Sequence, residues 1–290
     1  MRCLAGVTAL VFLGASSVLA GQTKLSPHWE ELTGPDFVVA IHQAQGVCML
    51  PFGIMEKHGA HLPLGNDLIN VRFVTDKAAD QNYAVIFPPY YFGQIAEAKH
   101  QPGTVSYSMR LQLDLLQETT DEMARNGCKK IVIVNGHGGN EHLLPFFAQQ
   151  QLQSPHDYVV YIYRWQAGGA DRPYKPTATD MHGGESETSR TMIAAPGLVH
   201  LDRAGQESGE DLKRLNLPDG VYTGIWWYAS FPNHYSGDGA LATRELGEYD
   251  TKAEVAAIAK VIAAVKSDTV SAKLQREFYE ESEHPLDTKQ

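Results

Sequence analysis

The densest group of potentially reactive side chains lies between residues 56 and 67, where two carboxylates and two imidazoles fall within twelve residues. They belong to Glu56, His58, His61 and Asp67. Glu56 and His58 are two positions apart, and in an extended segment this spacing turns both side chains to one face. Carboxylates and imidazoles together bind divalent metal ions. We therefore predict a metal site here, with the alternative that Asp67, which follows a Pro and Gly turn, caps a helix.

A second group follows the most apolar run of the chain. Residues 131–134 are Ile-Val-Ile-Val and lead into Asn-Gly-His-Gly-Gly-Asn at 135–140, so His137 stands at the carboxyl end of a predicted strand. Glycines at such a point let the backbone approach a ligand or another loop closely. A phosphate-cradling loop is the competing interpretation. It is disfavoured because the Lys and Ser or Thr of that motif are missing and the glycine spacing does not match a dinucleotide fingerprint.

A third group contains His182, Glu185 and Glu187, just before a short predicted helix that runs to about residue 195. A carboxylate in the first turn of a helix is favoured by the helix dipole without any function. Glu185 and Glu187 are therefore explained equally well by helix stability and by chemistry. His182 stands beside two glycines and has no such structural explanation, which makes it the stronger candidate.

The elements that would position these groups alternate along the chain. Four short runs are almost wholly apolar, as in strands covered on both faces, and between them lie segments with apolar residues at three- and four-residue spacing. The predicted strands are 47–52, 84–87, 130–134 and 158–163, and the predicted helices are 67–80, 109–125, 141–152 and 251–274. This order predicts a single three-layer α/β/α domain with a mostly parallel sheet. Its ligand crevice should lie at the carboxyl ends of the strands.

Composition sets outer limits on the function. The chain has 290 residues, 43% of them hydrophobic, with 24 basic and 34 acidic side chains and a formal charge of −10. This composition excludes a disordered, collagen-like or disulfide-scaffold protein and allows a sizeable core. Because no basic stripe is present to neutralise phosphates, we expect no nucleic-acid partner, and a small molecule fits better.

The first twenty residues differ from the rest of the chain. Arg2 is their only charge, an apolar run covers 4–13, and small residues precede Gly21. This pattern predicts a secretory signal peptide over residues 1–20, cleaved near Ala20, because the apolar run is too short for a membrane span. The mature domain, 21–290, should then be periplasmic or secreted, with no membrane association after cleavage.

Two cysteines, Cys48 and Cys128, remain after this cleavage. The first lies inside a predicted strand and the second just before another. Two buried thiols are the default expectation, and one disulfide in an oxidising compartment is the alternative.

The three groups together resemble the creatininase family of metal-dependent amidohydrolases, over roughly residues 29–247. The pattern Glu-x-His-Gly-x-His-Leu-Pro-x-Gly-x-Asp at 56–67 carries the resemblance most specifically. The segments at 135–140 and 182–189 look like the family's second and third signatures. Weaker similarities are Lys-His-Gln-Pro-Gly-Thr at 99–104 and Gly-Asp-Gly-Ala-Leu-Ala-Thr at 237–243, where Gly239 replaces the family's proline.

The resemblance implies a centre of two divalent metal ions, either zinc, manganese or iron. Glu56 and His137 would hold one ion, His58 would hold the other, and Asp67 would bridge them. This assignment agrees with the metal site that the spacing predicts without the family.

One ligand of the family is missing here. Creatinine amidohydrolase has a glutamate two residues after the histidine of the second signature, where this chain has Gly139. Another carboxylate should therefore complete the second ion, and Glu187 is the expected one. Glu185 is the fallback, or else a partner that orients His182. His182 itself matches the family's histidine proposed to shuttle protons.

The resemblance also implies a catalytic function. The chain would be a hydrolase of carbon–nitrogen bonds other than peptide bonds, in which a metal-bridging hydroxide attacks a small amide, lactam, formamide or short peptide. The aromatic residues that flank creatinine are not evident at matching positions, which argues against creatinine as the substrate. The alternatives are a non-catalytic, metal-containing binding protein of the same fold and a two-metal phosphoesterase, which would need positive side chains near the metals.

The resemblance further implies a homo-oligomer, often a hexamer. The aromatic run Trp226, Trp227 and Tyr228 could wall a pocket or pack at a subunit interface, and for such a run the structural role is favoured.

Overall fold

The computed structural model describes residues 25–165, 172 and 179–288. The predicted signal peptide at 1–20 lies outside the described residues. Within them, no helix has both the length and the apolarity needed to cross a membrane.

The centre of the fold is a four-stranded, wholly parallel sheet with strand order β2-β1-β3-β4. Its strands are β1 (Val47–Phe52), β2 (Val85–Ile86), β3 (Lys130–Asn135) and β4 (Val159–Arg164). β1 and β3 pair along their full length, from Val47 opposite Lys130 to Phe52 opposite Asn135. Because the strands are parallel, the loops that leave β1 and β3 emerge at the same edge of the sheet.

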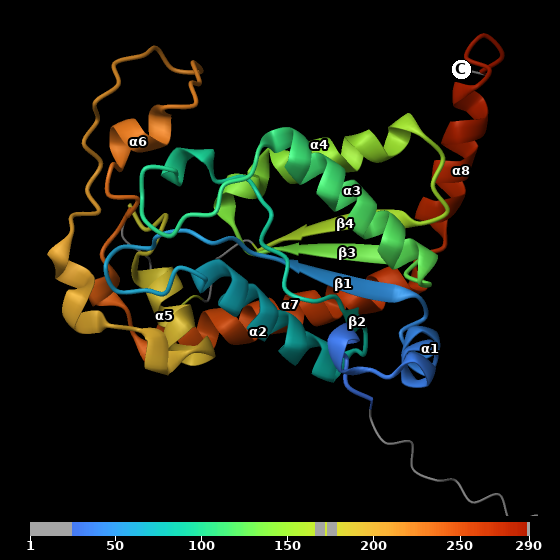
Figure 1. Ribbon diagram of the computed structural model, residues 1–290, viewed down its shortest axis with the longest axis horizontal. Coiled ribbons are helices and arrows are strands. Elements are labelled where there is room, and N and C mark those ends of the chain that lie inside the picture. The colour runs from blue at the N-terminus through green and yellow to red at the C-terminus, as the bar shows by residue number, and fades with distance from the viewer. Residues whose placement is uncertain (1–24, 166–171, 173–178, 289–290) are drawn as a thin grey trace, which may run out of the picture.

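Helices cover both faces of this sheet, so the predicted three-layer α/β/α class is confirmed (Figure 1). α3 and α4 lie on one face, and α2, α5 and α7 lie on the other. The helices are α1 (Gly34–Gln43), α2 (Asn66–Gln81), α3 (Met109–Arg125), α4 (Leu143–Gln150), α5 (Glu185–Ala194), α6 (Trp226–Ser230), α7 (Arg244–Ser267) and α8 (Val270–Ser282). Short 3-10 helices occur at Trp29–Glu31, Ala96–Ala98, Gly138–Glu141, Gln151–Gln153, Pro196–Leu198, Leu201–Gln206 and Gly239–Leu241.

The alternation of side chains along β1 explains the two layers of the core. Leu50 and Phe52 pack with residues of α3 and α4 such as Leu116, whereas Met49 packs on the other face with residues of α2 and α7 such as Val74. All six residues of β1 are buried. Burying a large apolar side chain contributes roughly 2 kcal/mol to the stability of the fold, so an almost wholly apolar strand is favoured only in the middle of such layers.

Cys48 of β1 and Cys128, just before β3, form a disulfide, so the default expectation of two free thiols is wrong. Both residues are completely buried. The bond joins positions 80 residues apart, and closing a loop of this length stabilises a fold by about 4 kcal/mol in the chain-entropy model. It therefore fixes β1 to the segment that enters β3, the two strands whose ends carry the candidate ligands.

The closing helix differs from its prediction. Residues 251–274 were expected to form one helix, but the structure contains α7 and α8 with a break at Asp268. The Asp268 carboxylate accepts hydrogen bonds from the amide nitrogens of Val270 (2.8 Å) and Ser271 (3.1 Å), which replaces helical bonding at this point.

Candidate metal centre

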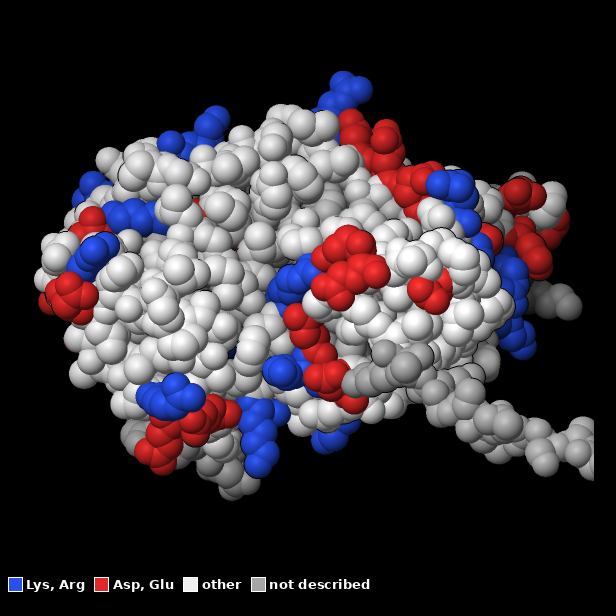
Figure 2. Space-filling view, turned by 60° about the horizontal axis from the view of Figure 1, so that its bottom comes forward, with Lys and Arg blue, Asp and Glu red and all other residues white. Residues whose placement is uncertain are grey.

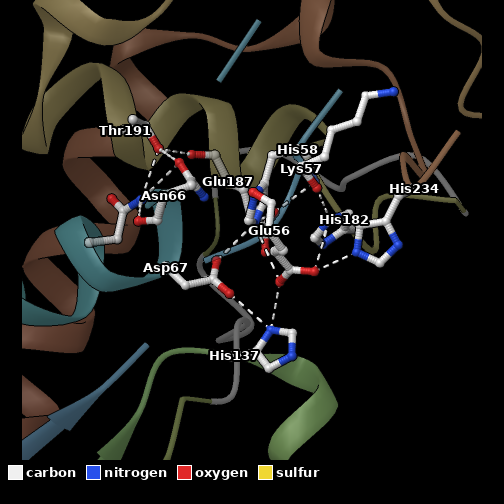
Figure 3. Close-up of polar contacts among 12 residues, drawn as sticks. Glu56, Lys57, His58, Asn66, Asp67, His137, His182, Glu187, Thr191 and His234 are labelled. Atoms are coloured by element: carbon white, nitrogen blue, oxygen red, sulfur yellow. Dashed lines mark hydrogen bonds and ion pairs between the residues drawn. The ribbon is translucent and has the colours of Figure 1, made fainter. Parts of the chain in front are cut away.

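The three groups of candidate residues meet at the carboxyl ends of β1 and β3 and at the N-terminal end of α5 (Figure 3). Glu56 and His58 follow β1, Asp67 lies in the first turn of α2, and His137 follows β3. His182 precedes α5 by three positions. All of these side chains are buried, although each is polar or charged. Buried charges are stable only when they are paired or bind a metal, so the cluster requires compensation.

A glycine lets β1 and α2 approach each other closely at this point. A Cβ atom at Gly53 would lie 2.4 Å from the Cα atom of Leu68, well inside any normal contact distance. Only glycine therefore allows the chain leaving β1 to pass the start of α2, where Asp67 lies.

Asp67 lies between two imidazoles. Its Oδ1 is 2.8 Å from Nε2 of His58, and its Oδ2 is 2.9 Å from Nδ1 of His137. α2 begins at Asn66 and its N-cap is Gly65, so the alternative interpretation of Asp67 as the cap is wrong. The two oxygens of one carboxylate thus face two different candidate ligands, as a bridging carboxylate would.

Glu56 completes one side of this arrangement. Its Oε1 lies 2.7 Å from Nδ1 of His137 and 3.9 Å from Nε2 of His58, and it is a buried oxygen without a hydrogen-bond partner. Burial acts to raise the pKa of Glu56, but the positive charge of His137 and the hydrogen bond from His234 hold that pKa well below its ordinary value. The carboxylate therefore stays ionised, with one oxygen free to bind a cation.

Backbone carbonyls fix the orientation of both imidazoles. Nδ1 of His58 is 3.3 Å from the backbone oxygen of Glu56, and Nε2 of His137 is 2.9 Å from the backbone oxygen of Gln94. A carbonyl only accepts, so these nitrogens carry the hydrogens, and each ring turns its other nitrogen toward the carboxylates. This pattern is typical of histidine ligands held by an outer hydrogen bond.

The pKa values of the same rings also indicate a cation site. Burial acts to lower the pKa of His58, but Asp67, Glu187 and Glu56 raise it to about 10. The pKa of His137 is likewise raised well above its ordinary value by Glu56 and Asp67, against the effect of burial. The carboxylates therefore favour a positive charge at both ring nitrogens. A divalent ion would supply that charge, so the residues present fit a metal centre.

The geometry groups the candidate ligands into three sets whose donor atoms lie within 4.8 Å of one another. These sets are Glu56 with Asp67 and His137, His58 with His182 and Glu187, and Glu56 with His182 and His234. Among the described residues, Glu185 belongs to none of them. It is the first residue of α5 and is buried.

Glu187 is the carboxylate that approaches His58 from α5. Its Oε2 lies 3.7 Å from Nε2 of His58 and accepts a hydrogen bond from the amide nitrogen of Gly183 (2.6 Å). Burial raises the pKa of Glu187 to about 7, against the opposing charge of His58. At Gly139 a Cβ atom would lie 2.4 Å from Nε2 of His137, so no side chain fits there without movement. Glu187 therefore lies beside His58, and its role as the replacement ligand stays a prediction.

His182 stacks near His58, with the ring centroids 4.1 Å apart. Its Nε2 lies 2.8 Å from the backbone oxygen of Lys57 and therefore donates to it. Burial, together with the charge of His58, lowers the pKa of His182 to about 3, so the ring is neutral.

Sequence reasoning missed His234. It follows α6 and lies outside the three motifs, so no local pattern marks it. Its Nε2 nevertheless forms a short hydrogen bond with Oε2 of Glu56. His61 belongs to the first motif but is directed elsewhere, because its Nε2 lies 2.8 Å from Oγ1 of Thr188.

A cavity of about 260 Å³ opens above the cluster. Among the candidate ligands, the cavity is lined by Glu56, His137, His182 and Glu187. Its other lining residues include Gln94, Glu97, Glu141, Met181, Tyr222, Trp226 and Trp227. Two residues of the aromatic run, Trp226 and Trp227, thus line this cavity. Tyr228 lines a neighbouring one.

Fold and site together define an α/β protein with a buried carboxylate–imidazole cluster suited to divalent metal ions. The model of the creatininase family, described as creatinine amidohydrolase, matches residues 30–262, and the chain belongs to this family. This confirms the resemblance carried by the three motifs.

Relatives and a solved structure agree with this assignment. Creatinine amidohydrolase of Pseudomonas putida is 28% identical over 60% of this chain and 74% of its own length. A mycofactocin precursor peptide peptidase of Mycolicibacterium smegmatis is 30% identical over 56% of this chain and 63% of its own length. A creatininase variant in a Zn–Zn form has the same fold, with a TM-score of 0.71 at 23% identity over 84% of this chain and all of that one. The solved structure supports the fold, and the two relatives together with the cluster of candidate ligands support a hydrolase that binds divalent metal.

Proposed function

We propose that this protein is a metal-dependent hydrolase that cleaves a carbon–nitrogen bond in a small amide, lactam, formamide or short peptide. The observation that carries the proposal is the position of Asp67, whose two carboxylate oxygens face His58 and His137 on either side. A bridging carboxylate is the central ligand of a site for two ions. The names of the relatives point to substrates of this kind, a cyclic amide for one and a peptide for the other.

Five residues would hold the ions. Glu56 and His137 would bind one, His58 and Glu187 the other, and Asp67 both. Zinc, manganese and iron all suit such a mixed set of ligands. When bound, the ions supply a water of lowered pKa and polarise the carbonyl of the substrate.

His182 is the proposed proton shuttle for the leaving nitrogen. Because its Nε2 donates to the backbone oxygen of Lys57, its Nδ1 has the free lone pair. The neutral ring can accept a proton at Nδ1 and pass it to the departing nitrogen. Glu185 stands outside the three ligand sets, so its proposed role is to orient His182 rather than to bind metal.

The cavity supports a small substrate or the end of a peptide. A volume of about 260 Å³ admits a molecule of modest size, and Tyr222, Trp226 and Trp227 offer flat apolar walls. Among its described lining residues there is no lysine or arginine. A phosphate ester would lack the positive partners it needs, so this lining disfavours a phosphoesterase.

The disulfide supports an exported location, since disulfides form in oxidising compartments and are rare in the cytosol. We therefore keep the proposal of a periplasmic or secreted protein with a leader at residues 1–20.

We also propose a homo-oligomer, with a hexamer as the expected form. Figure 2 shows a broad area of one face without charged side chains. The segment before α6 projects from the body of the protein (Figure 1) and exposes a series of apolar side chains. They are Leu212, Leu215, Leu217, Val221, Tyr222 and Ile225. Exposed apolar surface of this kind is typical of protein interfaces.

Elemental analysis followed by a turnover assay tests the proposal. Purified protein should contain about two equivalents of divalent metal and hydrolyse members of a panel of lactams, formamides and short peptides. Asp67→Asn should lose both properties, and Glu248→Gln, a matched change in an exposed ion pair with Arg244, should lose neither. Metal content without turnover over the whole panel would instead favour the binding protein.

A further inference from the structure

His234 has two unusual features for a residue outside the recognised motifs. Only 2% of its surface is exposed, although it is polar. Its backbone is left-handed, with φ at 53°, a conformation that costs energy for a residue other than glycine. Its amide nitrogen donates to the backbone oxygen of Phe231 (2.9 Å), which holds this turn against the end of α6. Strained backbone that persists in a buried position often serves a site.

The hydrogen bonds of the ring determine where its proton lies. The indole Nε1 of Trp227 donates to Nδ1 of His234 at 2.8 Å. An indole N–H only donates, so Nδ1 must be the accepting, unprotonated nitrogen. Nε2 therefore carries the hydrogen of the neutral ring and donates it to Oε2 of Glu56.

This donation makes the two oxygens of Glu56 unequal. Oε2 accepts from His234, whereas Oε1 has no hydrogen-bond partner and lies beside Nδ1 of His137. We propose that His234 is a positioning residue that commits Glu56 to bind metal through Oε1 alone, and that Trp227 locks His234 in the tautomer this requires. The inference rests on the metal centre of the proposed function.

The same assignment removes one of the three possible metal sets. Glu56, His182 and His234 come close enough to hold an ion, but both ring nitrogens of His234 are already engaged. Nε2 of His182 is likewise engaged with the backbone oxygen of Lys57. His234 thus supports a ligand and is not one itself.

The arrangement also links the pocket wall to the metal centre. Trp227 lines the cavity and, through one N–H, orients the ring that holds Glu56. Replacing Trp227 by Phe keeps an aromatic wall but removes the N–H. The variant Trp226→Phe is a matched control, because Trp226 lines the same cavity and the described contacts give it no bond to His234.

The test measures metal affinity of the purified full-length protein with Zn²⁺ against a chromophoric chelator, and the visible spectrum of the Co²⁺-loaded protein. His234→Ala should weaken the binding of one ion by about 10- to 100-fold, as is usual when an outer hydrogen bond to a ligand is lost. His234→Gln should restore affinity to within a few-fold, since its amide can donate to Glu56 and accept from Trp227. Trp227→Phe should weaken the same ion, and Trp226→Phe should not.

Two results would overturn the inference. One is wild-type affinity and an unchanged Co²⁺ spectrum in His234→Ala. The other is a loss in His234→Gln as large as in His234→Ala, because donation to Glu56 would then not be the cause. If His234→Ala does not fold by circular dichroism, His234→Gln and Trp227→Phe decide the question. Since neither readout needs a substrate, an inactive but metal-binding protein would refute the hydrolase and leave this inference standing.

Discussion

Asp67, the candidate bridging ligand, contacts His58, a candidate ligand of the second ion. Oδ1 of Asp67 lies 2.8 Å from Nε2 of His58. The residues are nine positions apart: His58 lies in the loop that joins β1 to α2, and Asp67 lies in the first turn of α2. The other nitrogen of His58 is held by the backbone oxygen of Glu56. Nε2 therefore has one orientation, toward the carboxylates, before any ion binds.

Metal binding should release protons. The pKa of His58 is raised to about 10 against the effect of burial, so without metal the ring is protonated at neutral pH, and His137 is raised in the same direction. The charged rings stabilise the metal-free fold fully below pH 6.5 and lose this effect as the pH rises toward 10. A metal ion must displace these protons, so its apparent affinity should increase by about tenfold per pH unit for each proton released.

Titration of metal-free protein with Zn²⁺ at pH 6.5, 7.5 and 8.5, in buffers of different ionisation enthalpy, measures this release. An affinity independent of pH would contradict the positions assigned to both rings.

Asp67→Ala and His137→Ala should each lose bound metal, and Asp67→Ala should lose more. Asp67 faces both imidazoles, whereas His137 contacts the carboxylates of one side only, so the bridging residue serves both ions. Elemental analysis of the purified variants compares them directly. Full occupancy in both would refute the metal centre.

Glu187→Gln should remove about one metal equivalent and nearly all turnover, while Glu185→Gln should keep both ions and lose activity only in part. In Glu187→Gln the side-chain amide oxygen can still accept from the amide nitrogen of Gly183, so the start of α5 should be preserved and only the negative charge near His58 is lost. Metal content and turnover, measured on the same preparations, decide between them. The reverse pattern would move the ligand to Glu185.

Much of the layered fold could be predicted because it depends on local patterns. The apolar runs at 47–52 and 130–134 became β1 and β3 almost residue for residue, and α3 has the predicted bounds. The helix α1 was not predicted, although Thr33 caps it by accepting from the amide nitrogen of Asp36 (3.3 Å) and a proline stands in its first turn. The sequence therefore carries a helix start signal at Thr33.

Other features depend on contacts between distant segments. The pairing of Cys48 with Cys128 follows from the adjacency of β1 and β3, which no spacing in the chain specifies. His234 reaches Glu56 from 178 residues away. The first two motifs each follow a strand of a parallel sheet, so the sequence alone predicts that they lie at the same edge. His234 stands in a loop far from both motifs, so its place in the site could not be predicted.

The leader and the disulfide give a joint prediction about export. A short apolar run with one basic residue and small residues before Gly21 predicts cleavage after Ala20, and the buried Cys48–Cys128 bond needs an oxidising compartment. Expressed in a bacterium with its own leader, the protein should be found outside the cytoplasm, begin at Gly21 and show no thiol that alkylates after denaturation. A matched version that starts at residue 21 and stays in the cytoplasm should alkylate at both cysteines.

N-terminal sequencing and mass spectrometry test both statements. An intact Met1 on the soluble protein would reject the signal peptide, and free thiols in the exported protein would reject the bond.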